Sequence, residues 1–183
     1  MKILTLLGSS RKAGNTEQLV KEITAGLKSS TIHLEDHHIK PIVDMRHTEQ
    51  GFSHIEDDYE ELLKQFLSHD IIIFATPIYW FGMSGQMKVF IDRWSQYLRD
   101  SRYNMKEELS KKTAYVVAAG GTNPKITALP LVQQFNYIFE FVHMNFEDYI
   151  IGNAVKPGEI ELDGPSLTKA KVWNRKFAQL QAK

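Results

Sequence analysis

The sequence predicts an α/β fold, a doubly wound sheet of five parallel strands with helices on both faces. Two observations lead to this prediction. Five short apolar runs alternate along the chain with segments whose apolar residues recur at helical spacing. The third run, DIIIFATPIYW at 70–80, is almost wholly apolar and rich in β-branched residues, which is typical of a central parallel strand covered on both faces.

The predicted strands share short length and apolar character, and the second alternates apolar and polar residues. They cover 2–7, 30–36, 70–80, 112–121 and 145–152. The predicted helices share apolar residues three or four positions apart. The first begins at Thr16, and the other four cover 59–67, 83–94, 131–142 and 167–181, so that one helix follows each strand. Asp57 and Asp58 favour the start of the second helix, and Pro130 is tolerated in the first turn of the fourth.

Composition narrows the functional classes. The chain of 183 residues has 22 Lys+Arg and 22 Asp+Glu, a net charge of 0, so no general field attracts nucleic acid or an anionic membrane. There is no cysteine, which excludes disulfides, thiolate nucleophiles and iron–sulfur clusters on cysteine ligands. No stretch reaches the ~20 apolar residues of a membrane span. We expect a single cytoplasmic domain over 1–183.

Ligands of doubly wound sheets bind beyond the carboxyl ends of the strands. After the first predicted strand comes GSSRKAGNT, Gly8 to Thr16, which leads into a helix N-terminus that favours an anion. The loop contains hydroxyl, amide and guanidinium groups that can donate hydrogen bonds, and a glycine that lets a ligand come close to the backbone. The candidate anion-binding residues are Ser9, Ser10, Arg11, Gly14, Asn15 and Thr16.

Two nucleotide-binding motifs do not fit this loop. G-x-G-x-x-G is absent, and the glycine spacing is one residue too long for a Walker A loop, with Asn15-Thr16 where Lys-Ser/Thr would stand. The alternative to an anion site is an ordinary strand-to-helix turn in which Asn15 or Thr16 caps the helix.

The loops after the third and fourth strands supply a different surface. Pro77, Ile78, Tyr79, Trp80 and Phe81 follow the third strand, and such aromatic residues suit a flat ligand. An aromatic patch at a subunit interface is the compatible alternative. Gly120 and Gly121 follow the fourth strand and leave space and N–H donors, although a tight turn explains them equally. Together the loops predict a site with an anion at one end and a planar ring at the other, a shape that FMN has.

The chain also resembles a known family at these residues. GSSRKAGNTEQL, FATPIYWFGMSGQMKVFIDRW and the AAGG loop are similar to the NAD(P)H-dependent FMN reductase family of flavodoxin-like proteins, up to about residue 150. The resemblance implies a three-layer sheet in the order 2-1-3-4-5 and a homodimer or homotetramer with flavin near a subunit interface. It implies phosphate contacts from Ser9, Arg11, Asn15 and Thr16, and ring contacts from Pro77 to Trp80 and from Gly120 and Gly121.

The function implied is that of an NAD(P)H-dependent FMN-containing oxidoreductase. Hydride would pass from NAD(P)H to bound FMN, and electrons then to a small acceptor in a ping-pong cycle: a quinone, an azo or nitro compound, free flavin or a metal ion. The flavin carries the chemistry, so no side chain is named as catalytic. The alternative is a flavodoxin-type electron carrier without an NAD(P)H site, but such carriers are usually strongly acidic. A receiver domain needs acidic residues after the first strand, and this chain has none there. A low-molecular-weight phosphatase needs a cysteine nucleophile, and the chain has no cysteine.

One departure from the family concerns residues 36–54. The related iron–sulfur flavoproteins carry a cysteine cluster in this segment, whereas this chain has none. Four histidines near Asp44, namely His37, His38, His47 and His54, have no standard metal-ligand spacing, so no metal site is predicted. Lys88 and Asp92 lie four residues apart on a predicted helix and are expected to be structural or interfacial.

Overall fold

A five-stranded parallel sheet forms the centre of the protein in a computed structural model, which describes residues 1–182. The strand order is β2-β1-β3-β4-β5 and every neighbouring pair is parallel, so the predicted fold is confirmed. The strands are β1 (Ile3–Leu7), β2 (Ser29–His33), β3 (Ile71–Pro77), β4 (Thr113–Gly120) and β5 (Asn145–Asn153).

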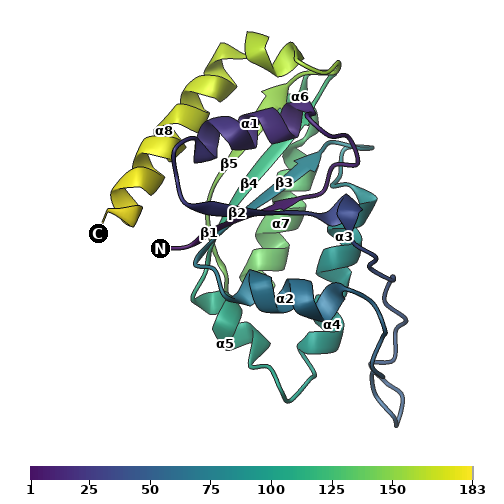
Figure 1. Ribbon diagram of the computed structural model, residues 1–183. Helices are drawn as coiled ribbons and strands as arrows, with labels where there is room; N and C mark the ends of the chain where they lie inside the picture. Colours follow the sequence, from purple (N-terminus) through teal and green to yellow (C-terminus); the bar gives the residue numbers. More distant parts are fainter. Residues whose placement is uncertain (183) are drawn as a thin grey trace.

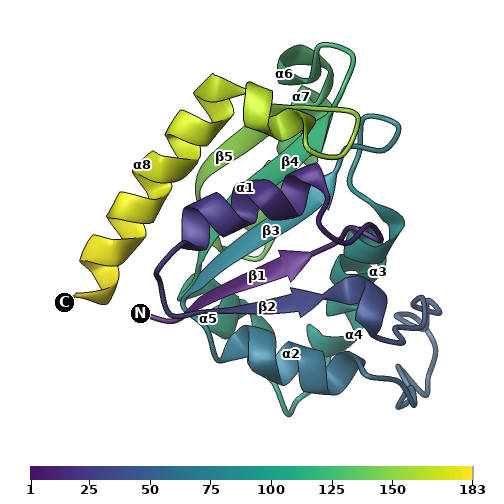
Figure 2. The same ribbon diagram turned by 45° about the horizontal axis from the view of Figure 1, so that its top comes forward.

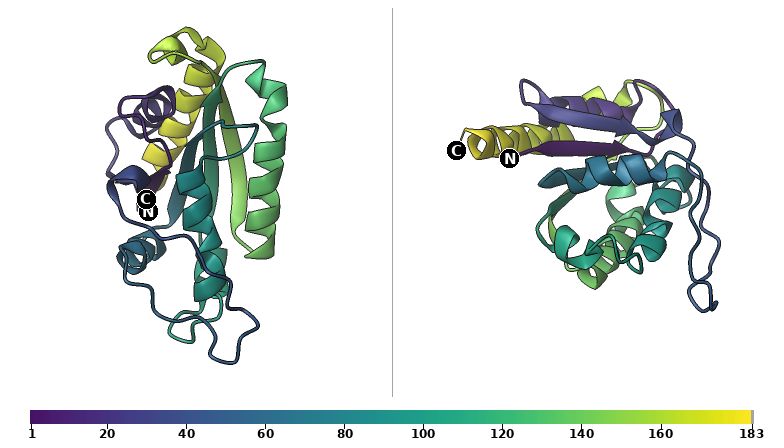
Figure 3. Two further views of the ribbon diagram at one scale, coloured as in Figure 1. Left: turned by 90° about the vertical axis from the view of Figure 1, so that its right-hand side faces the viewer. Right: turned by 60° about the horizontal axis from the view of Figure 1, so that its bottom comes forward.

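Helices cover both faces of the sheet, giving three layers (Figures 1 and 3). One face carries α1 (Asn15–Thr24) and α8 (Gly164–Gln181), which pack side by side. The other face carries α2 (Tyr59–Leu67), α3 (Gly85–Asp92), α4 (Trp94–Tyr97), α5 (Met105–Ser110) and α7 (Leu129–Phe141). The short α6 (Pro124–Thr127) lies between β4 and α7 in the chain.

Strand pleating divides the core into two apolar clusters, because successive side chains point to opposite faces. In β1, Leu4 and Leu6 pack with the α2, α3 and α7 layer, whereas Ile3 and Leu7 pack with α1 and α8. The same alternation continues in β3 and β4. Burial on both faces explains why these strands read as continuous apolar runs.

Two predicted strands, 30–36 and 70–80, run three residues past the carboxyl ends of the observed ones. Residues Leu34–Asp36 form a 3-10 turn, because β2 pairs only with β1 and the last pair joins His33 to Leu7. Strand β3 ends at Pro77, which pairs with Ala119 of β4, because the chain turns back shortly afterwards between Tyr79 and Gly82. The predicted helix over 83–94 is interrupted at Arg93, and α5, α6 and a 3-10 turn at Glu159–Leu162 were not predicted.

The carboxyl ends of the strands lie at one edge of the sheet (Figure 2). The purple loop after β1, the teal turn after β3 and the green loop after β5 gather there. Helix α3 starts at this edge with Ser84, whose hydroxyl accepts a hydrogen bond of 3.2 Å from the N–H of Met87. Within residues 1–182, no helix is long and apolar enough to cross a bilayer.

Candidate functional site

The loop between β1 and α1 presents free hydrogen-bond donors. Ser9 shapes it, since its hydroxyl oxygen lies 3.2 Å from both the backbone N and the backbone O of Arg11. Helix α1 follows Gly14 without a side-chain cap, which leaves first-turn N–H groups for an anion. The exposed Arg11 guanidinium forms no ion pair within residues 1–182. These groups suit a phosphate.

Glu17 lies beside this loop, and the protein neutralises its carboxylate, as Lys12 does for Asp36 at 3.3 Å. Glu17 accepts a 2.6 Å hydrogen bond from the N–H of Ala13, and Lys21 Nζ lies 2.8 Å from its other oxygen. Burial raises the pKa of Glu17, but the bonds from Lys21 and Ala13 outweigh it and hold the pKa below its usual range. Glu17 is therefore charged at neutral pH, and Lys21 limits its repulsion of a bound anion.

The aromatic residues after β3 form a tight two-residue hairpin turn. Backbone hydrogen bonds of 3.0 and 2.9 Å join Tyr79 and Gly82 in both directions. Trp80 and Phe81 occupy the two central positions with φ of 49° and 64°, a left-handed conformation that non-glycine residues rarely adopt. The turn exposes 95% of Trp80.

A cleft of about 200 Å³ lies between these two loops and the carboxyl end of β4. Gly120 and Gly121 let two side chains lie close to the backbone at this cleft: a Cβ atom on Gly120 would lie 3.0 Å from Ile78, and one on Gly121 would lie 2.3 Å from Val155 Cγ2. Larger residues at either glycine would meet these side chains. The cleft thus has a polar end at the β1–α1 loop and an apolar end at Ile78 and Tyr79.

The cleft brings together nine of the thirteen predicted cofactor-binding residues. These are Ser9, Arg11, Asn15, Thr16, Pro77, Ile78, Tyr79, Gly120 and Gly121. The four that do not line it are Ser10, Gly14, Trp80 and Phe81. Ser10 is exposed and Gly14 precedes the helix, while Trp80 and Phe81 stand at the exposed tip of the hairpin turn.

Three further lining residues were missed: Ala119, Ala154 and Val155. The last two belong to the loop after β5, whose end shares an edge with the other strand ends, and this topology was the signal that could have found them. The side chain of Asn15 bonds to this loop: its Nδ2 donates to the carbonyl of Lys156 at 2.9 Å, and its Oδ1 accepts from the N–H of Ile160 at 3.4 Å.

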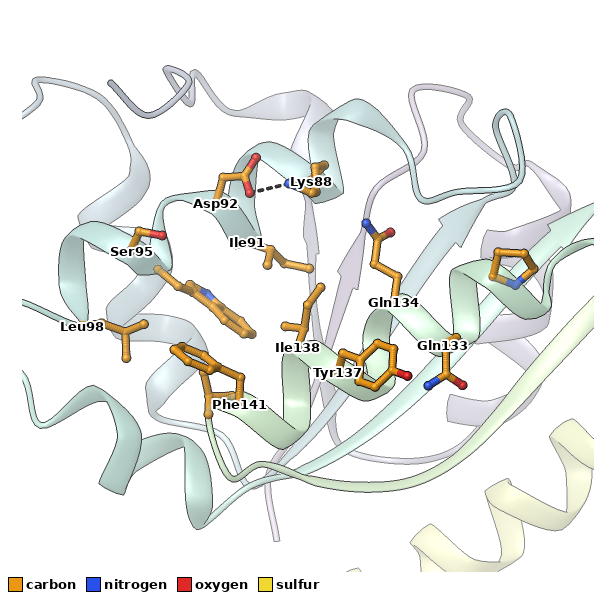
Figure 4. A pocket seen from close by; sticks show the side chains of 13 residues that line it. Lys88, Ile91, Asp92, Ser95, Leu98, Gln133, Gln134, Tyr137, Ile138 and Phe141 are labelled. Atoms are coloured by element: carbon orange, nitrogen blue, oxygen red, sulfur yellow. Dashed lines mark hydrogen bonds and ion pairs between the residues drawn. The ribbon is translucent and has the colours of Figure 1, made fainter. Parts of the chain in front are cut away.

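A second, larger cavity of about 670 Å³ is a groove between α3, α4 and α7 (Figure 4). Its walls are mainly apolar, with Ile91 and Leu98 facing Ile138 and Phe141. Lys88 and Asp92 pair with each other at 2.5 Å at its margin, which agrees with the structural role expected for them. No strand-end loop lines this groove and it offers no anion site, so the smaller cleft is the candidate cofactor site.

The segment from His37 to Asp58 is held by a buried ion pair. The guanidinium of Arg93 binds the carboxylate of Asp57, and both side chains are almost fully buried. Arg93 also donates to the carbonyl of Lys40 at 3.1 Å. In the part of the chain that the structure describes, no three His, Cys, Asp or Glu side chains are grouped so that they could hold a metal ion.

Comparison with known proteins identifies the family. The family model of NADPH-dependent FMN reductases matches residues 1–156. The chain belongs to this family. The Bacillus subtilis protein YwqN, named as an NAD(P)H-dependent FMN-containing oxidoreductase, is 48% identical over 171 residues, which cover 93% of this chain and 94% of YwqN. This membership confirms the predicted resemblance and makes the chain an oxidoreductase of this family.

Two further relatives agree with the fold and with the departure noted above. A solved structure of the Trp repressor binding protein from Bacillus subtilis superposes with a TM-score of 0.78 at 42% identity, over 92% of this chain and 95% of that one. An iron–sulfur flavoprotein of Methanocaldococcus jannaschii is 29% identical over 98% of this chain and 97% of its own. This chain has no cysteine with which to hold a cluster.

The residues of the cleft fit FMN chemically. Arg11 and the uncapped start of α1 supply donors for a phosphate, and Ile78, Tyr79 and the side-chain-free backbone of Gly120 and Gly121 line the part of the cleft that suits a flat ring. The volume of about 200 Å³ is below the roughly 300–1,000 Å³ of most small-molecule sites. A bound flavin would therefore extend beyond the cleft into the space at its mouth.

Proposed function

We propose that the chain forms a single FMN-binding domain over 1–183 and acts as an NAD(P)H-dependent oxidoreductase on a small electron acceptor. The observation that supports this most directly is that an anion-binding loop and an apolar slot open into one cleft at the carboxyl ends of the strands. The name of YwqN, which describes an FMN-containing and NAD(P)H-dependent enzyme, agrees with the proposal.

In this proposal the protein binds the phosphate and orients the ring. Arg11 and the first-turn N–H groups of α1 hold the phosphate, and Ile78, Tyr79 and the two glycines after β4 flank the ring. When bound, FMN supplies the redox chemistry, taking a hydride from NAD(P)H and passing electrons on. The proposal assigns no side chain as an acid or base, because the flavin carries the chemistry; among the described residues that line the cleft, Arg11 and Tyr79 are the titratable ones.

The acceptor is a small molecule of the quinone, azo, nitro, flavin or metal-ion class. The exposed faces of Tyr79 and Trp80, 51% and 95% accessible, lie beside the cleft and suit stacking with a flat acceptor.

We also propose that the protein is a homodimer or homotetramer that buries the groove between α3, α4 and α7. Tyr137 and Phe141 stand on one face of α7 and are 62% and 64% exposed. Lys88 and Asp92, which line the groove, pair with each other, and Lys106 lies over the ring of Phe141 with its Nζ 4.5 Å from the ring centre. Exposed aromatic side chains beside an apolar groove are typical of protein–protein interfaces.

The visible spectrum of the purified protein tests the proposed function. The protein is expected to carry, or to take up, one FMN per chain, and the flavin absorption should bleach when NADH or NADPH is added without oxygen. Adding a quinone or an azo dye should then restore the colour. Protein that binds FMN but is bleached by neither nucleotide would contradict the reductase activity.

A further inference from the structure

The geometry points to Asn15 as a positioning residue that holds the outer wall of the cleft, rather than as a phosphate ligand. This inference rests on the proposed function, because it concerns the same cleft. The sequence alone places Asn15 among the phosphate donors. In the structure, its side chain instead fixes the loop after β5 against the start of α1.

The first support is the use of both ends of the Asn15 amide. Nδ2 donates to the carbonyl of Lys156 at 2.9 Å, and Oδ1 accepts from the N–H of Ile160 at 3.4 Å. Asn15 is 8% exposed, and these partners lie 141 and 145 residues away in the chain. An amide has two N–H donors, so one is left over after these contacts. A comparison of FMN with riboflavin separates a bond from that N–H to a phosphate from the contact with the loop.

The second support is the construction of the loop that Asn15 holds. The carboxylate of Glu159 accepts from the N–H groups of Val155 and Lys156 at 2.8 and 2.9 Å, which closes a compact turn. On the sheet side, the N–H of Ala154 donates to the carbonyl of Gly120 at 2.8 Å. On the other side, the contacts of Asn15 and the fully buried side chain of Ile160 attach the loop to α1 and to the apolar core.

The third support is the position of Val155. This residue lines the cleft, and its Cγ2 comes within 2.3 Å of the place where a Cβ on Gly121 would stand. It therefore forms the wall beside the glycines that flank the ring in the proposed function. Val155 is also 66% exposed, so few contacts of its own hold it in place. Its position depends on the loop, and through Lys156 and Ile160 on Asn15.

A positioning role and a phosphate role predict different ligand selectivity. If Asn15 sets the wall, its loss weakens every ligand that carries the ring, with or without a phosphate. If Asn15 binds the phosphate, its loss weakens FMN and leaves riboflavin unchanged. Both ligands can be titrated by the quenching of their fluorescence.

The experiment compares Asn15→Ala with two matched variants. We expect Asn15→Ala to weaken FMN and riboflavin by the same factor, roughly fivefold to tenfold, the scale of one lost hydrogen bond. Glu159→Gln, which loosens the turn, should give the same pattern. Arg11→Ala should weaken FMN alone. A loss confined to FMN in Asn15→Ala, matching Arg11→Ala, would overturn the inference.

Amide hydrogen exchange in the protein without flavin gives a second readout. Exchange over residues 154–160 should become faster in Asn15→Ala and stay unchanged in Arg11→Ala. Unchanged exchange in Asn15→Ala would overturn the inference even if riboflavin binds too weakly to titrate. Failure of the unaltered protein to bind FMN would instead contradict the proposed function, because the exchange measurement does not depend on flavin.

Discussion

Removing the charge of Asp57 should strongly destabilise the protein. Asp57 and Arg93 form an ion pair whose side chains are 1% and 0% exposed. The Arg93 guanidinium also lies 4.5 Å from the ring centre of Tyr59, and Asp57 accepts from the N–H of Lys40 at 3.0 Å. Asp57→Asn keeps the shape of the side chain but leaves the buried guanidinium without a counter-charge.

The expected size follows from this burial. Breaking a buried ion pair by removing one partner costs about 3–5 kcal/mol, because the other charge stays out of water. For a domain of this length, each kcal/mol lowers the midpoint of thermal unfolding by roughly 2–4 °C, so the total is roughly 6–20 °C. Asp44→Asn is the matched control, because Asp44 and its partner Arg46 are about half exposed, and it should leave the midpoint unchanged.

The pH dependence should change in the same variant. Burial raises the pKa of Asp57, but the hydrogen bonds from Arg93 and from the N–H groups of Lys40 and Tyr59 outweigh it, so the pKa lies below its usual range. The pair therefore stabilises the protein fully above about pH 4, and this contribution is lost as the pH falls through the lowered pKa. Asp57→Asn should lack this loss.

Urea unfolding followed by tryptophan fluorescence measures the loss of stability and its pH dependence. Urea is uncharged, so it does not screen the ion pair. The midpoints of the unaltered protein, Asp57→Asn and Asp44→Asn are compared at pH 7, and the first two are compared again between pH 3 and 5. If Asp57→Asn unfolds at the same urea concentration as Asp44→Asn at pH 7, the reasoning about the buried pair is refuted.

Three further predictions concern the turn, the cleft and the groove. The double substitution Trp80→Asn with Phe81→Gly should raise the free energy of unfolding by about 1–2 kcal/mol, because Asn and Gly adopt the left-handed conformation of this turn more readily than Trp and Phe. Urea unfolding checks this, and a lower stability would contradict it. Gly120→Ala should weaken FMN binding about tenfold or more by pressing on Ile78, with near-native stability, as titration and melting would show. Phe141→Glu should convert the oligomer to monomers in light scattering, and an unchanged mass would exclude the groove as the contact.

The sequence predicted the fold because its signals are strong and local. Strands buried on both faces read as apolar runs, and β3 between residues 71 and 77 is the clearest case. The ends of elements depend on partners that are distant in the chain, so they were less predictable. Residues 34–36 leave the sheet because β1 offers no partner beyond Leu7. The short helices α5 and α6 contain too few turns for a period to show.

The candidate site was predictable in its location but not in its details. Motifs and topology indicated the loops after β1, β3 and β4, and the structure brings these together. The conformation of Trp80 and Phe81 depends on the hairpin closure between Tyr79 and Gly82, which no pattern of residue types reveals. The contacts of Asn15 with a loop more than 140 residues away could not be read from its neighbours in sequence.

A crystal structure of the protein grown with FMN tests the central claim most directly. We predict the phosphate at the start of α1 within hydrogen-bond reach of Arg11, and the flavin ring beside Tyr79 and Gly120. Density for the ring in the groove beside Phe141, or a cleft without flavin at saturating FMN, would contradict the claim.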